Sequence, residues 1–387
     1  MATGITTDKN YTITARTKSL NPGSIRFKKK KSEKKHNITA LVVNPTSSGG
    51  STGKDWDIQF TKIKEIFGEN PEIVFTQKSG DGTSLTRDLL RRGFTRIVAI
   101  GGDGTINEVA NGFFTQVEKQ RRKKTIGNDN TRDLLNSGNQ NKGQFPKSPL
   151  LKPINPDSTM GLIPSGTRNV LAKSLDLPED IVQCCSNLVV GTSKKIDIIS
   201  ATVSAPISPE DLSKGSKLIT RVFLNAAELG VAAEIIDRSK KVRNTVKSRL
   251  LSTVTSLAVT VPYYESNLCE VSIDDGKENI LTKMTMCVIA NGRYLGGGLM
   301  AAPKASVSDG LLDIVILKDS GGIKMLDYFV DIKDGDYANK PDILYRQARK
   351  VSIKSKERDV TAAIDGEPIG VLPATFEVQR SALTIRM

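Results

Sequence analysis

The sequence predicts two domains: an α/β N-terminal domain with a parallel, doubly wound sheet, and a mainly antiparallel, β-rich C-terminal domain. The first observation is length, because 387 residues exceed what one ordinary hydrophobic core organises. The second is a regular alternation of apolar strand patterns with helical patterns before residue 195. The third is a change after that point to short segments with period-two character, which is typical of antiparallel sheets.

The N-terminal domain is expected over residues 37–194, with strands and helices in βαβαβ order. This order indicates parallel strands joined by helices, and ligands bind at the carboxyl ends of such strands. Residues 116–158 are rich in Lys, Asn, Gly and Pro, which predicts a flexible insertion. The expected strands are Ile38–Val43, Ile73–Phe75, Ile97–Ile100 and Met160–Ile163. The expected helices are Trp56–Phe67, Ser84–Arg92, Ile106–Phe114, Val170–Ser174 and one from Pro178 to Val190.

The C-terminal domain is expected over residues 195–387 as an antiparallel sheet or sandwich. Helices near residues 232–257 and 322–330 should pack on it, and the last strands could return to the N-terminal domain. The expected strands are Ile196–Val203, Leu218–Leu224, Cys269–Ile273, Met284–Ile289, Leu312–Leu317, Val351–Ile353, Val360–Ile364 and Thr375–Val378.

The net charge of +14 is concentrated at the N-terminus. Residues 1–36 hold ten Lys and Arg but only two acids, with the densest run at Lys28–Lys31. We expect a basic, disordered tail, since no amphipathic period accompanies the run. The functional alternative is a tether to anionic lipid headgroups, in which each Lys near the surface contributes about 1 kcal/mol. No motif supports specific nucleic-acid binding.

The residue types present narrow the chemistry. The sequence has no C-x-x-C pair and a single histidine, His36, so neither a zinc site nor a histidine-based triad is expected. Catalysis would therefore rely on carboxylates, hydroxyls, backbone amides and metal. No apolar run reaches the roughly 18 to 20 residues of a membrane-spanning helix, and no secretory signal is evident, so we expect a cytoplasmic protein.

A glycine-rich loop, Gly101-Gly102-Asp103-Gly104-Thr105, follows one buried strand and opens the next helix. Glycines let backbone N–H groups approach a polyphosphate, and the helix N-terminus adds a positive potential. Asp103 is unfavourable next to phosphate, but it suits a role facing Mg²⁺ or accepting a proton from an attacking hydroxyl. Taken alone, the loop is also compatible with a glycine-rich turn capped by Asp103.

Two further polar loops follow strands that should end at the same edge of the sheet. Asn44-Pro45-Thr46-Ser47-Ser48-Gly49-Gly50 follows the first strand, and Pro164-Ser165-Gly166-Thr167-Arg168-Asn169 follows the strand at Met160–Ile163. Small hydroxyls and amides can cap phosphate oxygens. Three such loops at one edge predict a polyphosphate site.

As a set, these motifs resemble the diacylglycerol kinase catalytic-domain family, which includes bacterial-type diacylglycerol and other lipid kinases and sphingosine kinases, within an NAD kinase-like superfamily. The resemblance spans roughly residues 38–387, although the first glycine loop alone also occurs in NAD kinases. The C-terminal motifs that extend it are Asn291-Gly292, Gly296–Gly298, Ala302-Pro303-x-Ala305, Asp309–Asp313 and Asp365-Gly366-Glu367.

The resemblance implies an ATP- and Mg²⁺-dependent kinase that phosphorylates the hydroxyl of a diacylglycerol-like or sphingoid lipid. Such a kinase would associate peripherally with the inner face of the membrane. The C-terminal domain would bind the lipid. Asp365 and Glu367 match the segment that carries the catalytic base, and Asp103 is the competing candidate. Mg²⁺ would bind Asp309 and the backbone oxygens of Ser306 and Leu311. The implied nucleotide contacts are Asn44, Pro45, Thr46, Ser47, Thr76, Gly101, Gly102, Asp103, Gly104, Thr105, Asn107, Thr167 and Asn169.

The sequence also departs from the family pattern. Val170 stands where members usually have Asp after Gly-Thr-x-Asn, so a contact made by that acid is missing or comes from elsewhere. Two other functions therefore stay open: an NAD kinase-like phosphotransferase, and a non-catalytic nucleotide-binding protein associated with membranes. The sequence does not identify the lipid, and it leaves open whether the protein is a homodimer.

Overall fold

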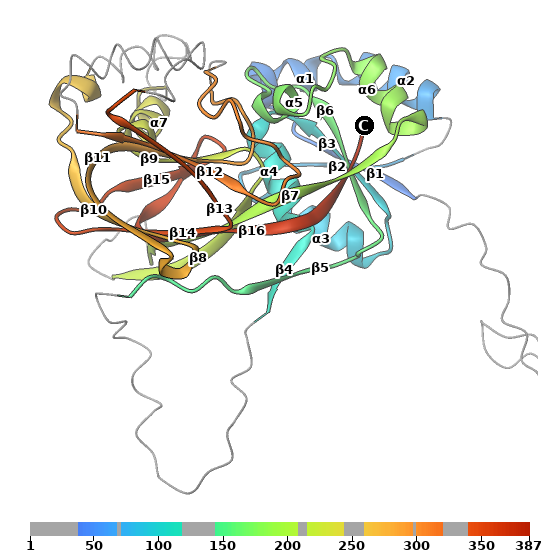
Figure 1. The fold of residues 1–387 in the computed structure, drawn as a ribbon. Helices are drawn as coiled ribbons and strands as arrows, with labels where there is room; N and C mark the ends of the chain where they lie inside the picture. Colours follow the sequence, from blue (N-terminus) through green and yellow to red (C-terminus); the bar gives the residue numbers. More distant parts are fainter. Residues whose placement is uncertain are drawn as a thin grey trace, which may run out of the picture. The chain divides into compact units, whose positions relative to one another are not determined.

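The protein has the predicted combination of an α/β half and an antiparallel, β-rich half (Figure 1). The computed structural model describes residues 38–67, 71–117, 144–207, 215–243, 259–296, 299–319 and 340–387. Residues 39–387 belong to one compact unit.

The parallel sheet of the first half contains β1 (Thr39–Val43), β2 (Glu72–Phe75), β3 (Arg96–Gly101) and β6 (Thr159–Pro164). Its strand order is β6-β3-β1-β2, and all three pairings are parallel. Alternate residues of these strands enter two different hydrophobic clusters. Both faces are therefore buried, as expected for a parallel sheet covered by helices.

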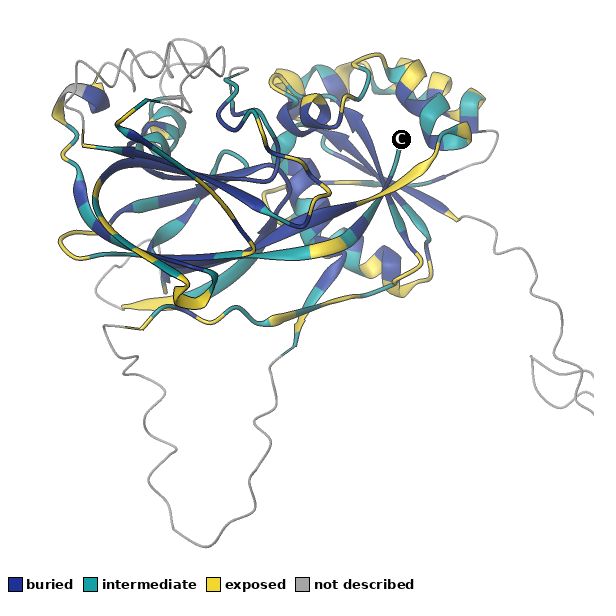
Figure 2. Ribbon diagram, in the orientation of Figure 1, coloured by how far each residue is buried: buried dark blue, intermediate teal, exposed yellow. Residues whose placement is uncertain are grey.

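Helices cover the two faces of this sheet. The helices α2 (Trp56–Phe67) and α6 (Ile181–Val190) pack over one face. The helices α3 (Asp81–Arg91) and α4 (Asp103–Gly112) pack over the other. Figure 2 shows their outer faces exposed and the strands between them buried. The short elements of this half are η1 (Ser47–Gly50), α1 (Ser51–Lys54), α5 (Val170–Ser174), β4 (Phe114–Val117) and β5 (Leu150–Pro153).

The second half is built from antiparallel strands around a large apolar core, with α7 (Val231–Arg243) packed on β9, β11 and β15. Its strands are β7 (Ser193–Pro206), β8 (Ser216–Phe223), β9 (Ala226–Gly230), β10 (Asn267–Ile273), β11 (Glu278–Ala290), β12 (Leu312–Lys318), β13 (Ile343–Ala348), β14 (Lys350–Ser355), β15 (Thr361–Ile364) and β16 (Glu367–Arg386). Two short helical turns are η3 (Val261–Tyr263) and η4 (Asp274–Gly276).

The last strand joins the two halves. The strand β16 pairs antiparallel with β7 over most of its length, and its end pairs in parallel with β6 at Ile385↔Met160. The parallel sheet is thus extended by the C-terminal end of the chain. Because hydrogen bonds are continuous across this junction, the position of β15 and β16 is fixed relative to the strand-end loops of the first half.

Several element boundaries differ from the sequence-based expectation. The strands β4 and β5 pair with each other, and β5 lies within the stretch 116–158, for which the composition predicted a flexible insertion. The strands β9 and β13 were not expected, because Ala-Ala-Glu-Leu-Gly is poor in β-branched residues and β13 has three consecutive polar or aromatic residues. The tail 1–36, residues 118–143, residues 244–258 of one expected helix and all of the expected helix 322–330 lie outside the described residues.

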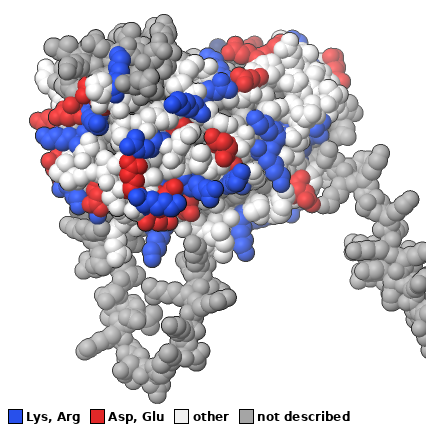
Figure 3. All heavy atoms as spheres, viewed as in Figure 1, with Lys and Arg blue, Asp and Glu red and all other residues white. Residues whose placement is uncertain are grey.

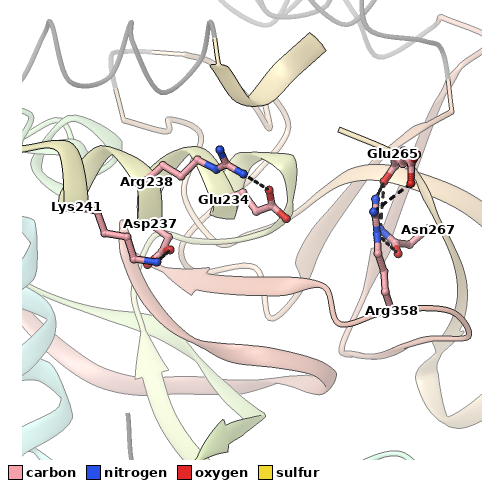
Figure 4. Close-up of polar contacts among 7 residues, drawn as sticks. All are labelled: Glu234, Asp237, Arg238, Lys241, Glu265, Asn267 and Arg358. Carbon is pink, nitrogen blue, oxygen red and sulfur yellow. Dashed lines mark hydrogen bonds and ion pairs between the residues drawn. The ribbon is translucent and has the colours of Figure 1, made fainter. Parts of the chain in front are cut away.

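Charges of both signs alternate on the face of the molecule drawn in Figure 3. On the outer side of α7, Arg238 pairs with Glu234 at 4.0 Å and Lys241 with Asp237 at 2.6 Å (Figure 4). Exposed pairs of this kind contribute little to stability, commonly about 0.3–0.5 kcal/mol. In the part of the chain that the structure describes, no helix is both long enough and apolar enough to span a bilayer.

Candidate functional site

Loops of the first half and strand residues of the second half surround a polar cavity of about 280 Å³. The loops at the carboxyl ends of the parallel strands contribute most of the lining, as expected for ligand sites in open α/β sheets. The lining residues are Asn44, Thr46, Thr76, Gln77, Lys78, Ser79, Gly104, Thr105, Glu108, Arg221 and Glu367. Six of them were predicted from the sequence: Asn44, Thr46, Thr76, Gly104, Thr105 and Glu367.

The first loop and the glycine loop are locked together by side-chain hydrogen bonds. Asn44 Nδ2 donates to Thr105 Oγ1 at 2.9 Å, while Asn44 Oδ1 accepts from the backbone N–H of Thr46 at 3.0 Å and from its hydroxyl at 2.8 Å. Asn44 therefore holds Thr105, at the start of α4, beside the end of β1. This arrangement places the N-terminus of α4 and its positive potential at the cavity.

The third loop packs directly against the glycine loop. A Cβ atom on Gly166 would lie 2.5 Å from the Cα of Gly102, so the two backbones can approach this closely only because both residues are glycines. Gly101 is equally constrained, since a Cβ there would lie 2.6 Å from Thr105 Oγ1. Asn169, at a φ of 48°, closes the loop by accepting the N–H of Gly166 at 2.9 Å. These residues shape the loops without lining the cavity.

Two other predicted nucleotide contacts also have structural roles. The Ser47 hydroxyl is buried and bonds to Thr52 Oγ1 at 2.7 Å, and Thr52 Oγ1 in turn bonds to Ser165 Oγ at 2.6 Å. The carbonyl of Pro45 accepts the N–H of Gly53 at 2.9 Å. Thr167 is likewise absent from the cavity lining.

Asp103 is turned toward the third loop. Its Oδ1 accepts the N–H of Val170 at 2.8 Å and that of Leu171 at 3.4 Å, so its carboxylate caps the N-terminus of α5. Burial raises the pKa of Asp103, while these two backbone N–H groups and the charge of Arg168 act in the opposite direction. Val170, which departs from the family pattern, thus donates its backbone N–H to Asp103.

Asp365 lies in the turn between β15 and β16 and accepts four hydrogen bonds. Its Oδ1 accepts from the N–H groups of Asn225 at 3.0 Å and Ala226 at 3.1 Å. Its Oδ2 accepts from the N–H of Leu224 at 3.1 Å and from Asn107 Nδ2 at 2.8 Å. Burial raises the pKa of the Asp365 carboxyl, against the lowering effect of these donors. With four donors around two oxygens, Asp365 connects the start of β9 to helix α4.

Glu367 lies two residues further and lines the cavity. A Cβ atom on Gly104 would lie 3.6 Å from Glu367 Oε1, so this carboxylate faces the glycine loop across the junction of the two halves. Its other oxygen, Oε2, accepts a hydrogen bond from Lys240 Nζ of α7. Of the three acids predicted for catalysis, Glu367 is the one that lines this cavity.

The loop predicted to bind Mg²⁺ lies apart from the cavity lining. Asp309 and Ser306 are exposed, and Asp309 Oδ1 accepts the N–H of Leu311 at 2.9 Å. The loop is fixed by buried Asp197, whose Oδ2 accepts the N–H of Gly310 at 2.6 Å. One carboxylate and two backbone oxygens form an oxygen-only donor set, which suits a hard cation such as Mg²⁺. Among the described residues, no cluster of three or more Asp, Glu, His or Cys is placed to hold a metal ion.

Sequence reasoning missed five residues of the cavity: Gln77, Lys78, Ser79, Glu108 and Arg221. The first three follow Thr76 directly, so the rule that strand ends carry ligand contacts could have included them. Glu108 lies one turn after Gly104 on α4, and its carboxylate accepts the N–H groups of Gly80 at 2.7 Å and Gly82 at 3.0 Å. Arg221 had no local signal, because it sits within a strand of the second half.

A buried acid close to the site was also missed. Glu228 of β9 is 6% exposed, and its Oε2 has no hydrogen-bond partner among the described residues. Burial raises its pKa to about 8, the charge of Asp365 raises it further, and the charge of Arg168 lowers it. Its position within Ala-Ala-Glu-Leu-Gly gave no functional signal.

A parallel sheet whose strand-end loops converge on one polar cavity, with a carboxylate supplied by a second, β-rich half, defines a two-domain protein with a candidate ligand site where the halves meet. The comparisons with known proteins agree with this class. Residues 39–201 match the diacylglycerol kinase catalytic domain, and residues 226–387 match the YegS C-terminal NAD kinase beta sandwich-like domain.

Relatives and solved structures cover nearly the whole chain. A diacylglycerol kinase of Bacillus subtilis (strain 168) is 25% identical over 345 residues, which cover 87% of this chain and 91% of that protein. A diacylglycerol kinase of Staphylococcus carnosus (strain TM300) is 24% identical over 345 residues, with 87% and 90% covered. The crystal structure of a diacylglycerol kinase from Bacillus anthracis str. Sterne shares the fold, with a TM-score of 0.59, 19% identity, and 92% and 98% of the two chains covered. The chain therefore belongs to the diacylglycerol kinase catalytic-domain family, as its motifs predicted.

Proposed function

We propose that the protein is an ATP- and Mg²⁺-dependent lipid kinase that transfers the γ-phosphoryl group of ATP to a lipid hydroxyl. Family membership supports a lipid kinase-type phosphotransferase. The observation that carries the finer proposal is the cavity in which the start of α4, at Gly104 and Thr105, faces the carboxylate of Glu367.

The nucleotide phosphates would lie against the start of α4. Backbone N–H groups there and the hydroxyl of Thr105 are donors for phosphate oxygens, and the helix terminus favours negative charge. The nucleoside would extend toward Thr76 and Ser79, which line the cavity beyond β2. About 280 Å³ is near the lower end of small-ligand sites, so the cavity suits part of a nucleotide rather than nucleotide and lipid together.

Glu367 is our choice for the general base. It takes the proton of the lipid hydroxyl while the oxygen of that hydroxyl forms a bond to the γ-phosphorus and the bond to the bridging oxygen of ADP breaks. Asp365 is less suited, because four donors already surround its carboxylate. Asp103 is less suited because its carboxylate caps α5. Both acids act by holding the loops that form the cavity.

When bound, Mg²⁺ would neutralise negative charge on the phosphate groups. Within the cavity lining, the carboxylates available to it are Glu108 and Glu367. A second ion at Asp309, with the backbone oxygens of Ser306 and Leu311, would stabilise the loop held by Asp197. We assign the cavity the catalytic role and the Asp309 loop a structural one.

The acceptor is a lipid, so the protein must work at a membrane surface. The basic segment Lys28–Lys31 supports this part of the proposal, because clustered lysines bind anionic headgroups. Diacylglycerol-like and sphingoid lipids are both suitable acceptors, since each presents a hydroxyl next to an apolar chain.

The test is phosphoryl transfer from γ-labelled ATP in the presence of Mg²⁺, with three acceptors in parallel. The acceptors are diacylglycerol dispersed in vesicles, a long-chain sphingoid base in the same vesicles, and NAD. We expect label in chloroform-extractable product with one of the lipids and none in NADP, and the Glu367→Gln variant should lose this transfer. Label in NADP alone would establish the NAD kinase alternative, and ATP binding without transfer to any acceptor would favour a non-catalytic protein.

A further inference from the structure

Arg221 is a cation of the β-rich half that reaches the cavity formed mainly by the first half. Among the described residues that line the cavity, the cations are Lys78 and Arg221. Lys78 comes from the loop after β2, on the side of Thr76. Arg221 comes from β8, the same half that supplies Glu367. A phosphate chain lying between the two halves would therefore meet a different cation on each side.

Two independent contacts fix the position of Arg221. The strand β8 pairs with β7 in the register Ala201↔Arg221. The next residue, Val222, bonds to helix α4 through both backbone groups: its N–H donates to Asn111 Oδ1 at 2.8 Å, and its carbonyl accepts from Asn107 Nδ2 at 3.0 Å. The strand β8, which carries Arg221, is thus hydrogen-bonded to helix α4, which begins within the glycine loop.

The guanidinium of Arg221 also contacts this helix directly. Its NH2 donates to Asn107 Oδ1 at 3.3 Å, and Asn107 Nδ2 donates to Asp365 Oδ2 at 2.8 Å. Asn107 lies one turn after Gly104, so the guanidinium is oriented beside the start of α4. This bond uses part of a group that carries five N–H donors in a planar fork, which matches the geometry of phosphate oxygens.

The two acids that line the cavity have partners other than Arg221. Glu367 accepts from Lys240, and Glu108 accepts two backbone N–H groups. Neither acid forms a hydrogen bond with Arg221 in the described residues. Phosphoryl transfer requires cations at the transferred group, because negative charge on its oxygens must be stabilised in the transition state.

We propose that Arg221 binds the terminal phosphoryl group of the nucleotide and stabilises it during transfer. This inference rests on the proposed function and adds a catalytic residue to it. It also gives the β-rich half, to which the family resemblance assigns lipid binding, a direct contact with the phosphoryl group to be transferred.

The experiment compares Arg221→Gln, Arg221→Lys and the control Lys217→Gln. Lys217 is exposed on the same strand, where it pairs with Ala205 outside the cavity. Equilibrium binding of ATP and AMP and the steady-state kcat and KM for ATP are measured for each variant, together with melting temperature. We expect Arg221→Gln to lower kcat about 100-fold, as for removal of one donor to a developing oxyanion. ATP binding should weaken while AMP binding stays unchanged, because AMP lacks the terminal phosphates.

Arg221→Lys should recover part of kcat, since it keeps the charge but loses the fork. Lys217→Gln should match the wild type within about twofold. The inference is overturned if Arg221→Gln behaves like Lys217→Gln, or if it weakens ATP and AMP binding equally. ATP binding by the wild type without transfer to lipid would overturn the proposed function, and the ratio of ATP to AMP affinity would still decide the role of Arg221. Failure of the wild type to bind ATP would overturn both.

Discussion

The two halves of the protein contribute to the cavity in different ways. The α/β half supplies loops: Asn44, Thr46, Gly104 and Thr105 all lie just after a strand or at the start of a helix. The β-rich half supplies charged side chains from within or beside its strands, Arg221 and Glu367, which are brought to the cavity by strand pairing. The positions of the loops thus depend on local backbone geometry, whereas Arg221 and Glu367 are also held by residues more than a hundred positions away, Asn107 and Lys240.

Within the β-rich half, the acids Asp365 and Glu367 differ in how many hydrogen bonds hold them. Asp365 accepts four hydrogen bonds and anchors the start of β9 to α4, whereas Glu367 faces the cavity with a single side-chain partner, Lys240. A carboxylate surrounded by donors stabilises structure, and one that faces a cavity is available for chemistry. Substitutions at the two positions should therefore separate folding from catalysis.

The largest effect is expected for Asp365→Asn. An amide cannot accept all four bonds, because its NH₂ group would face two donors, either the N–H of Leu224 with the amide of Asn107 or the N–H groups of Asn225 and Ala226. We expect the free energy of unfolding to fall by about 3 kcal/mol, since a buried network is broken, and activity to be lost with it. Urea denaturation measures the first change. An Asp365→Asn variant as stable as the wild type would contradict the anchoring role.

Glu367→Gln should give the opposite pattern. The side chain is 42% exposed, so we expect unfolding to change by less than about 0.5 kcal/mol. The value of kcat should fall by about 10²–10⁴-fold, because the base that accepts the hydroxyl proton is removed. The measurement is steady-state transfer from γ-labelled ATP to lipid, with thermal melting as the folding control. If kcat stays within threefold of the wild type, Glu367 is not the base.

Glu228 provides a test of pH dependence. Its pKa is raised from an ordinary value near 4.5 to about 8, mainly by burial, so the folded protein holds a proton that the unfolded chain releases. Stability should therefore be highest below about pH 4.5 as far as this group is concerned, and fall as pH rises toward 8. Glu228→Gln, which mimics the protonated acid, should stabilise the protein by roughly 3 kcal/mol at pH 7 and by little at pH 4.5.

Urea denaturation of wild type and Glu228→Gln at pH 4.5, 6, 7 and 8 measures this difference. Equal stability gains at every pH would mean that Glu228 does not titrate in this range. A loss of stability at pH 8 would mean that the carboxylate has a partner that the amide cannot replace.

The smallest effects are expected for two adjacent lysines of α7. Lys241 forms an exposed pair with Asp237, and Lys241→Gln should change stability by at most about 0.5 kcal/mol and leave the kinetics unchanged. Lys240→Gln should have a similarly small effect on stability but should lower kcat, because it removes the side-chain partner that orients Glu367. Identical kcat values for the two variants would show that Lys240 does not orient Glu367.

The sequence allowed much of the α/β half to be predicted, because its signals are local. The helix Trp56–Phe67 has the predicted bounds, and the glycine motif connects a strand to a helix as expected, although β3 extends to Gly101 and α4 already begins at Asp103. The roles of single residues were harder to predict. Nothing local shows that the Asp103 carboxylate caps α5, or that the Asn107 amide joins Asp365 to α4.

The missed residues have a common cause. Arg221 and Glu228 lie in strands, where the sequence reports burial and alternation but not the partners that a strand meets across the fold. The family resemblance located Asp365 and Glu367 without distinguishing them, since they are two residues apart in one turn. The distinction came from hydrogen bonds to residues 224–226 and from the cavity lining.

We propose that a nucleotide binds where the loops of the first half face Glu367 and Arg221. Hydrogen–deuterium exchange of the full chain with and without Mg²⁺ and ATP examines this binding site. Exchange should slow at residues 44–47, 76–79 and 101–108, with no change around the separate cavity lined by Phe113, Ser381 and Leu383. Unchanged exchange at the three loops, or protection confined to that second cavity, would contradict it.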